Sequence, residues 1–303
     1  MNIKAMLREC LPIYRVYIKS VEAYNRFRYQ KAKKEGKELE LLSGLYQRHL
    51  GKPLRNPPVS YTEKIQFSKL YDSTPLKGML SDKYAVREWV AEKIGEEYLI
   101  PLIGAWDCFD DIPWDELPDK FVLKTNHGSA TNIIVEDKSK ANKKEIKKKI
   151  DLWLSLDFAF SGKGFELHYS YIKPKVIAEQ YIVDSNGELN DYKFLCFNGK
   201  PHFCWVDVDR QIGHKRNVYD LEWNLQPWIQ AYPRSDREIP KPENFEDLKN
   251  IAQKLCEEFA HVRVDLYDVD GKIYFGEMTF TNAQGFNPIT PSEYDDMLGE
   301  LWK

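Results

Sequence analysis

Short runs rich in Val, Ile, Tyr and Phe fill the second half of the sequence, and turn residues separate them. Such runs predict β-strands, because β-branched and aromatic side chains suit a half-buried sheet. We expect strands at 175–183, 191–197, 202–208, 262–267 and 272–278, and a helix at 245–259. Three dipeptides favour tight hairpins: Asn186-Gly187, Asn198-Gly199 and Asp270-Gly271. The pattern predicts an antiparallel sheet with a covering helix.

The first half is dominated by helical periodicity. Residues 1–37 predict a helix, kinked or restarted at Pro12, with one apolar face formed by Ile3, Leu7, Cys10, Tyr14, Tyr17, Val21 and Tyr24. Further helices are expected after the proline-rich connector 52–60, with Ser60 or Thr62 as cap, and at 81–94, with Ser81 or Asp82 as cap. Strands are expected near 98–103, 121–125 and 131–135, and a solvated helix face at 138–149.

These elements predict an α+β chain. We expect a helical N-terminal extension at 1–58 and a catalytic region at 59–303, with a lobe boundary near 174–182.

Composition narrows the class of protein. A net charge of −3 argues against nucleic acid as the main partner. The sequence contains no run of about 18 apolar residues, so no transmembrane helix is predicted. Charged residues interrupt any signal-peptide core, and the five scattered cysteines form no C-x-x-C pair. These features predict a cytoplasmic protein with reduced thiols.

The N-terminal segment is strongly basic, with ten Lys or Arg against three Glu in residues 1–37. One interpretation is a helix packed on its own domain or on a second subunit. The other is a surface that contacts anionic lipid, or a membrane-bound assembly, at the inner face of the membrane.

The strongest candidate for a functional site is the segment 262–279. Its sequence predicts a hairpin that turns at Asp270-Gly271. Because side chains alternate along a strand, one face of the first strand carries Arg263, Asp265 and Tyr267. On the return strand the same alternation groups Phe275, Glu277 and Thr279. Two neighbouring carboxylates repel unless a cation separates them, and Mg²⁺ shared with phosphates suits such oxygen ligands. The alternative is a surface ladder of salt bridges.

Two lysines stand in apolar strands, where an unpaired charge is costly. Lys124 precedes a loop of small and polar residues, and Lys193 lies within Asp191-Tyr-Lys-Phe194. An anionic ligand would explain both, and so would partner carboxylates. A third lysine, Lys83, follows Asp82 at the expected start of a helix. The loop after Lys124 matches neither of the common glycine-rich phosphate motifs.

In this order the motifs resemble the ATP-grasp superfamily, and more narrowly its TupA-like branch, named for teichuronopeptide synthesis. The resemblance spans about residues 60 to 290. The phrases that carry it are Tyr61-Thr-Glu-Lys-Ile-Gln66, Asp82-Lys-Tyr-Ala-Val-Arg87, Phe121-Val-Leu-Lys-Thr-Asn-His-Gly-Ser129, Asp191-Tyr-Lys-Phe194, Arg263-Val-Asp-Leu-Tyr267 and Phe275-Gly-Glu-Met-Thr-Phe280.

The resemblance implies an ATP-grasp fold, in which two lobes hold ATP between them. It assigns phosphate contacts to Lys83, Lys124 and Lys193, and a closing loop to His127, Gly128, Ser129 and the residues up to Thr131. It assigns the adenine to Glu179, Gln180, Tyr181 and Ile182, and the ribose to Asp191. Arg263 and Lys193 would be the catalytic residues, and Arg263 would stabilise the reaction intermediate.

The resemblance also implies Mg²⁺ on Asp265 and Glu277. Here the chain departs from its relatives, because the superfamily usually has Glu-x-Asn where this sequence has Glu277-Met-Thr279. Three alternatives follow for the third ligand: Thr279 ligates directly, Asn282 takes its place, or one metal is held more loosely.

The activity implied is that of a carboxylate–amine ligase that uses ATP to form an acylphosphate. The TupA-like branch points to surface polysaccharide synthesis, with an amino acid or other amine joined to a uronic acid or a peptide-like group. Two alternatives stay open. Asp207-Val-Asp209 and Asp268-Val-Asp270 match the D-x-D pattern of glycosyltransferases that use nucleotide sugars. The chain can also be a nucleotide-binding scaffold without turnover.

Overall fold

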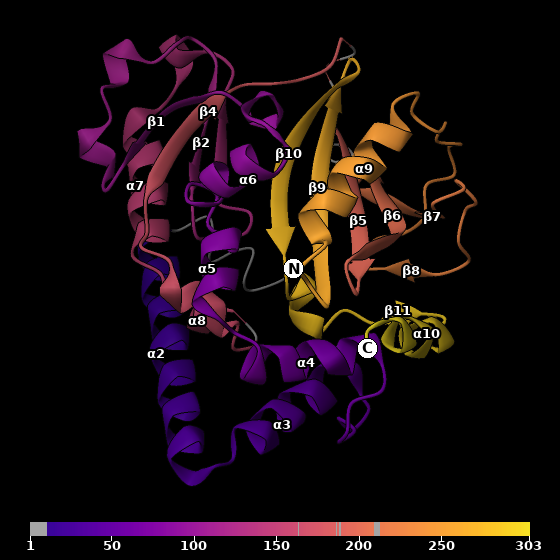
Figure 1. Ribbon diagram of the computed structural model, residues 1–303. Coiled ribbons are helices and arrows are strands. Elements are labelled where there is room, and N and C mark those ends of the chain that lie inside the picture. Colours follow the sequence, from indigo (N-terminus) through magenta and orange to yellow (C-terminus); the bar gives the residue numbers. More distant parts are fainter. Residues whose placement is uncertain (1–10, 163, 186, 188, 209–212) are drawn as a thin grey trace. The chain divides into compact units, whose positions relative to one another are not determined.

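The computed structural model describes residues 11–303 except 163, 186, 188 and 209–212 (Figure 1). The chain divides into two compact units. Unit 1 comprises residues 1–41, 73–86 and 101–181, and unit 2 comprises 42–72, 87–100 and 182–303. Helices and antiparallel sheets occur together, so the α+β prediction is confirmed. No helix within the described residues is both long enough and apolar enough to cross a membrane.

Unit 1 is built on a four-stranded antiparallel sheet. Its strand order is β1 (Leu102–Trp106), β4 (Val176–Gln180), β2 (Phe121–Thr125) and β3 (Asn132–Val135). The other elements are α2 (Leu11–Glu35), α5 (Pro75–Ser81), α7 (Lys143–Leu154), α8 (Phe158–Ser161) and the short helices η2 (Phe109–Asp111), η3 (Trp114–Glu116), η4 (Lys138–Lys140) and η5 (Leu167–Tyr171). Ile146 and Ile150 of α7 pack on Phe121 and Leu123 of β2, which forms the core of this unit.

Unit 2 is built on a five-stranded antiparallel sheet. Its order is β10 (Lys272–Thr279), β9 (His261–Val269), β5 (Asn190–Phe197), β6 (Lys200–Val208) and β7 (Lys215–Asp220). A small ladder joins β8 (Ile229–Gln230) to β11 (Ile289–Thr290). The helices are α4 (Tyr61–Tyr71), α9 (Phe245–Cys256), α10 (Glu293–Leu301), η1 (Glu96–Tyr98) and η6 (Asn282–Gly285). Two further helices, α3 (Glu38–Leu50) and α6 (Val86–Ile94), begin in unit 1 and end in unit 2.

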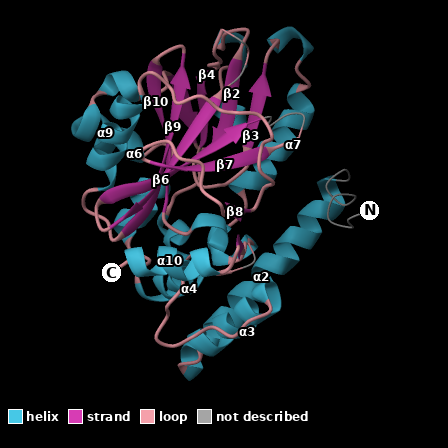
Figure 2. Cartoon of the chain, turned by 90° about the vertical axis from the view of Figure 1, so that its right-hand side faces the viewer, coloured by secondary structure: helices cyan, strands magenta, loops and turns pink. Residues whose placement is uncertain are grey.

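The two faces of the unit 2 sheet are covered differently. On one face α9 lies along the strands, and its Phe245 stacks on Phe194 (Figure 1). On the other face α4 and α10, which lie together in Figure 2, contribute to an apolar cluster with Leu195, Phe197 and Trp205. Side chains alternate along β5, so Asp191 and Lys193 share this second face with Leu195. One sheet face is therefore apolar at one end and charged at the other.

Several predicted boundaries were wrong, for local reasons. The helix expected at 81–94 begins only at Val86, because Asp82 accepts hydrogen bonds from the backbone of Tyr84 and Ala85 and closes a turn. The strand expected at 98–103 begins at Leu102, after the short helix η1. Strands β7, β8 and β11 were not predicted, since β8 and β11 are only two residues long and β7 opens with polar residues.

The apolar face predicted for the N-terminal helix is only partly buried, because Tyr14 packs in the cluster around Ile18 while other members of the face are exposed. Ile18 and Ala32 are buried, whereas Tyr17 is 38% and Tyr24 is 61% exposed. Ile3, Leu7 and Cys10 lie outside the described residues, as does Asn186 of the first predicted hairpin turn.

Candidate active site

The hairpin of β9 and β10 positions the charged end of the unit 2 sheet. Asp270 and Gly271 both have positive φ, as a tight hairpin turn requires. Asp265 lies opposite Glu277, so the predicted approach of these carboxylates is found. The ladder shifts register between Phe275 and Glu277. This bulge turns Phe275 to the opposite face, so the expected grouping of Phe275 with Glu277 was wrong.

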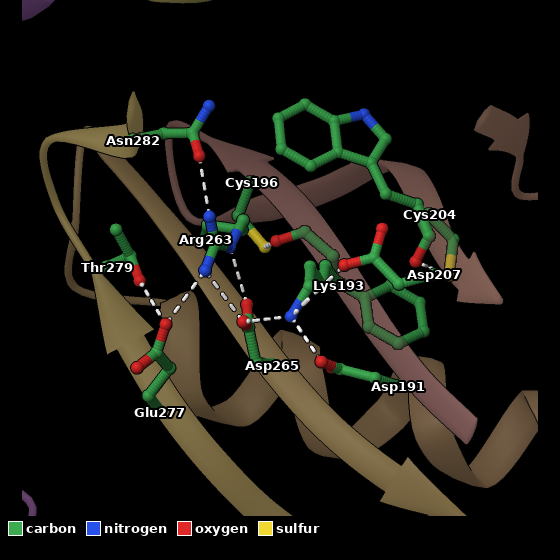
Figure 3. Close-up of polar contacts among 12 residues, drawn as sticks. Asp191, Lys193, Cys196, Cys204, Asp207, Arg263, Asp265, Glu277, Thr279 and Asn282 are labelled. Carbon is green, nitrogen blue, oxygen red and sulfur yellow. Dashed lines mark hydrogen bonds and ion pairs between the residues drawn. The ribbon is translucent and has the colours of Figure 1, made fainter. Parts of the chain in front are cut away.

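Arg263 stands at the centre of a group of oxygen atoms (Figure 3). Its guanidinium donates to both carboxylate oxygens of Asp265, at 2.6 and 2.7 Å, and to Glu277 Oε1 at 2.9 Å. A further bond of 2.6 Å reaches Asn282 Oδ1. Burial alone would lower the pKa of Arg263, but Asp265 and Glu277 raise it above its ordinary value. In this structure the cation between the two carboxylates is therefore the guanidinium.

Lys193 extends this charged group across the sheet. Its Nζ donates to Asp191 at 2.5 Å and to Asp265 at 2.6 Å, and lies 3.9 Å from Asp207. Burial lowers the pKa of Lys193, but the adjacent carboxylates outweigh it and the pKa is raised. Burial also raises the pKa of Asp265, and Arg263 and Lys193 reverse that effect and lower it. Opposite charges thus alternate along one face of the sheet.

The two candidates for a third oxygen ligand differ in where they point. Thr279 Oγ1 donates to Glu277 Oε1 at 3.1 Å. Asn282 instead turns its amide oxygen toward Arg263, because its amide nitrogen donates to Gln230 Oε1 at 2.8 Å. Gln230 is fixed in turn by its bond to the carbonyl of Asn287, at 3.0 Å. The amide oxygen of Asn282 therefore joins the two carboxylates around the positive centre.

Helix α4 supports the segment that carries Asn282. Within η6, Ala283 and Gln284 adopt left-handed backbone conformations that side chains rarely favour. Gln66 donates to the carbonyls of Gln284 and Gly285 at 3.1 and 2.9 Å, and the buried Lys69 donates to Gln284 at 2.8 Å. The polar face of α4 therefore holds a strained loop. The Tyr61–Gln66 motif signalled this helix, whereas nothing in the sequence singled out Gln230.

In unit 1, Lys124 and Glu179 come from the adjacent strands β2 and β4. Their side chains form an ion pair of 2.6 Å. The partner carboxylate that was one of the two explanations for Lys124 is therefore that of Glu179. Beyond Glu179, the Gln180 backbone N–H donates to Pro101 O at 3.0 Å, and the Tyr181 hydroxyl donates to Glu136 at 3.3 Å. Ile182 is the first residue of unit 2 in this segment.

Lys83 lies against the loop that follows Lys124. Its Nζ donates to the carbonyl of Gly128 at 2.6 Å, and its backbone N–H donates to Asn126 O at 3.0 Å. Asn126 also donates to Asp82 Oδ2 at 2.9 Å and accepts from the backbone of Lys175 at 2.7 Å. Asn126 thus ties the Asp82-Lys83 turn to the loop. No role was predicted for Asn126, although it lies inside the Phe121–Ser129 motif.

The loop itself has a buried base and an exposed tip. The hydroxyls of Thr125 and Thr131 are 2.8 Å apart at the base, and Ser129 is exposed. His127 points inward, with Nε2 3.1 Å from Leu156 O and its ring edge-on to Phe158. Burial lowers the pKa of His127 to about 4, so the imidazole is neutral at pH 7. Only the tip of the loop is exposed to solvent.

Replacing Gly128 by alanine is expected to weaken, by roughly tenfold, the nucleotide binding that the ATP-grasp resemblance predicts for this loop. A Cβ at this position would lie 2.6 Å from Thr131 Oγ1 and 2.8 Å from the Phe158 ring, so the loop must shift, and overpacking of this kind costs about 1–3 kcal/mol. Titration calorimetry with ADP measures the change. Gly44→Ala is the control, because a Cβ there meets nothing within 4 Å. Equal affinity in both variants would show that the loop tolerates the methyl group.

In the two D-x-D segments, Asp207 and Asp270 form hydrogen bonds with other residues of the chain. Asp207 is buried and accepts two hydrogen bonds from Arg216, at 2.6 and 2.9 Å. Asp270 lies in the hairpin turn and accepts from the backbone and the hydroxyl of Ser185. Asp209 lies outside the described residues.

The oxygen atoms around Arg263 fit Mg²⁺ by chemical type. Two carboxylates and one amide oxygen are hard ligands of the kind that this ion prefers. Among the described residues, no three His, Cys, Asp or Glu side chains are grouped as a metal site. The third oxygen here comes from the amide of Asn282, and the guanidinium of Arg263 occupies the position between the carboxylates.

Comparisons with solved structures found distant likenesses. D-alanine–D-alanine ligase from Bacillus anthracis has 19% identity and a TM-score of 0.42, over 74% of this chain and 67% of that one. L-amino acid ligase from Bacillus licheniformis has 13% identity and a TM-score of 0.42, over 80% of this chain and 54% of that one. The chain spans 44% of N5-carboxyaminoimidazole synthase from Aspergillus clavatus, at 11% identity, 67% coverage of this chain and a TM-score of 0.38.

A search of curated proteins found none that matches. A family model gives a firmer result. The model described as TupA-like ATPgrasp matches residues 63–303, which contain both the Lys83–Lys124 region and the group around Arg263. This match covers most of the sequence, so the chain belongs to the TupA-like ATP-grasp family.

Proposed function

We propose that this ATP-grasp ligase joins a carboxylate of a cell-surface polysaccharide, such as a uronic acid or a peptide-like group, to an amino acid or another amine. The observation that carries the proposal is the convergence of Asp265, Glu277 and Asn282 on Arg263, in a family of ATP-dependent ligases. The site of synthesis is proposed to be the cytoplasm, where ATP is available.

The proposed reaction has two steps. A carboxylate oxygen of the substrate attacks the γ-phosphorus of ATP, the bond to the β-phosphate oxygen breaks, and ADP leaves. The amine nitrogen then attacks the acyl carbon, phosphate leaves, and the nitrogen loses a proton to give the amide. Neither step needs a protein nucleophile. Catalysis rests on positioning and on stabilising negative charge.

Residues from several segments of the chain are proposed to act on the nucleotide. Lys83, Lys124 and Lys193 contact phosphates, and the loop from His127 to Thr131, with Gly128 and Ser129, covers them. Its exposed tip supports this role. Backbone groups from Glu179, Gln180, Tyr181 and Ile182 bind the adenine, and Asp191 binds the ribose. Arg263 stabilises the charge that develops on the transferred group, since its guanidinium is held rigidly in place.

Asp265, Glu277 and Asn282 are proposed to hold Mg²⁺, with Thr279 orienting Glu277. When bound, Mg²⁺ neutralises charge on the phosphates. The support for Asn282 over Thr279 is the orientation that Gln230 imposes on the Asn282 amide.

The decisive test is ADP release from MgATP by the purified protein, with candidate uronic acids and a mixture of amino acids. Release that depends on both substrates, together with an amide product identified by mass spectrometry, is the expected result. Lys124→Ala is the control and should abolish it. Binding of ATP without turnover on any glycan carboxylate would favour a nucleotide-binding scaffold. Turnover of nucleotide sugars without ATP would contradict the proposal.

Replacing Asn282 by alanine is expected to weaken Mg²⁺-dependent ADP binding by about tenfold or more, because one of three hard ligands is lost. Thr279→Val should change it by less than about threefold, since the Thr279 hydroxyl contacts Glu277 and not the positive centre. Calorimetry with ADP, with and without Mg²⁺, measures both. The reverse order of effects would make Thr279 the ligand.

A further inference from the structure

Helix α2 carries two different faces. On the inner face Ile18 packs with Leu152 and Leu156 of unit 1, and Arg26 forms a 2.8 Å ion pair with Asp157. Asn25 donates to the carbonyls of Phe160 and Gly162. This face anchors the helix, which Figure 2 shows as one continuous element.

A second apolar face points to solvent. Five large apolar side chains lie on it, with exposures of 55%, 69%, 38%, 61% and 64% for Ile13, Val16, Tyr17, Tyr24 and Phe27. We call these five residues the outer row. Counted from Ile13, the other four follow after three, four, eleven and fourteen residues, which places all five on one stripe of an α-helix. Packing within unit 1 does not account for the outer row, because the inner face of α2 makes the contacts with the rest of that unit.

Positive charge surrounds the outer row. Residues 11–37 contain eight Lys or Arg and two Glu. Exposed Lys31 and Lys34 continue the stripe beyond Phe27, at one and two helical turns. Arg28 lies over the ring of Tyr24, 5.4 Å from its centroid. An apolar stripe that ends in lysines fits a partner with an apolar interior and a negatively charged surface.

We propose that the outer row docks α2 on an anionic lipid bilayer. The helix lies in the plane of the interface, with aromatic and aliphatic side chains at the acyl boundary and lysines among the headgroups. A second copy of the chain suits this face less well, because it would bring two strongly basic helices together. The proposal goes beyond the ligase reaction and does not depend on it.

The test is flotation of the full-length protein with phosphatidylcholine vesicles, with and without phosphatidylglycerol. Binding only to the anionic vesicles is expected. Tyr24→Ser/Phe27→Ser and Lys31→Glu/Lys34→Glu should each reduce the bound fraction by roughly tenfold. Tyr71→Ser/Leu76→Ser is the matched control, because these apolar side chains are 68% and 46% exposed elsewhere on the surface, and it should bind as the unaltered protein does.

Three results would overturn the proposal. One is no binding to anionic vesicles by the unaltered protein. Another is undiminished binding by both outer-row and lysine variants that keep the thermal unfolding midpoint of the unaltered protein. The third is a dimer, seen by light scattering, that the Tyr24→Ser/Phe27→Ser variant dissociates, since the outer row would then cover a second copy.

Discussion

Changing Asp265 to asparagine is expected to lower ligase turnover by about a thousandfold or more. The carboxylate accepts two hydrogen bonds from Arg263 and one from Lys193. An amide is neutral and has only one acceptor oxygen, so it leaves two buried cations poorly compensated and removes a proposed Mg²⁺ ligand. The measurements are kcat for ADP release and Mg²⁺-dependent binding of ADP.

Asp207→Asn provides a matched control on the same sheet. Asp207 is equally buried, its pKa is also held below the ordinary value despite burial, chiefly by Arg216, and it accepts two hydrogen bonds from that arginine. Both variants should lose about 3–5 kcal/mol of unfolding free energy, because each breaks a buried ion pair. Only Asp265→Asn should abolish Mg²⁺-dependent binding. Equal losses of turnover in two comparably folded variants would mean that Asp265 acts through the fold alone.

The sequence was sufficient to locate the hairpin and its carboxylates. Asp270-Gly271 specifies a tight turn, and period-two alternation then brings Asp265 toward Glu277. Alternation failed at Phe275, because a bulge adds one residue to one strand only. The identity of the cation between the two carboxylates could not be predicted from the sequence either. A pattern shows that two carboxylates need a positive charge, but not that Arg263 supplies it here.

Residues that support the site from distant segments were harder to find. Gln230 contacts Asn282, 52 positions away, and Lys69 contacts Gln284, 215 positions away. Neither belongs to a local pattern, since these contacts arise only when the chain packs. Asn126 was missed for another reason. Asparagine is a common turn residue, so its presence in a loop singles out no contact. Its bonds to Asp82 and Lys175 join three separate segments of the chain.

Replacing Lys193 by methionine is expected to lower the free energy of unfolding by about 3–5 kcal/mol. Methionine has a similar length but no charge, so Asp191 and Asp265 would lose the ammonium that separates them at 2.5 and 2.6 Å. Urea denaturation at pH 7 measures the loss. The double variant Lys193→Met/Asp191→Asn should recover part of it, because one of the two buried negative charges is then absent.

The dependence of this loss on pH distinguishes charge from packing. In the unaltered protein the pKa of Asp265 is below its ordinary value, so its contribution to stability is present above the unfolded pKa and declines as the pH falls. Removing Lys193 removes one cause of that lowering. The stability difference between the two proteins should therefore shrink from pH 7 toward pH 4. A difference that stays constant over this range would show that the aliphatic packing of Lys193, and not its charge, holds the sheet face together.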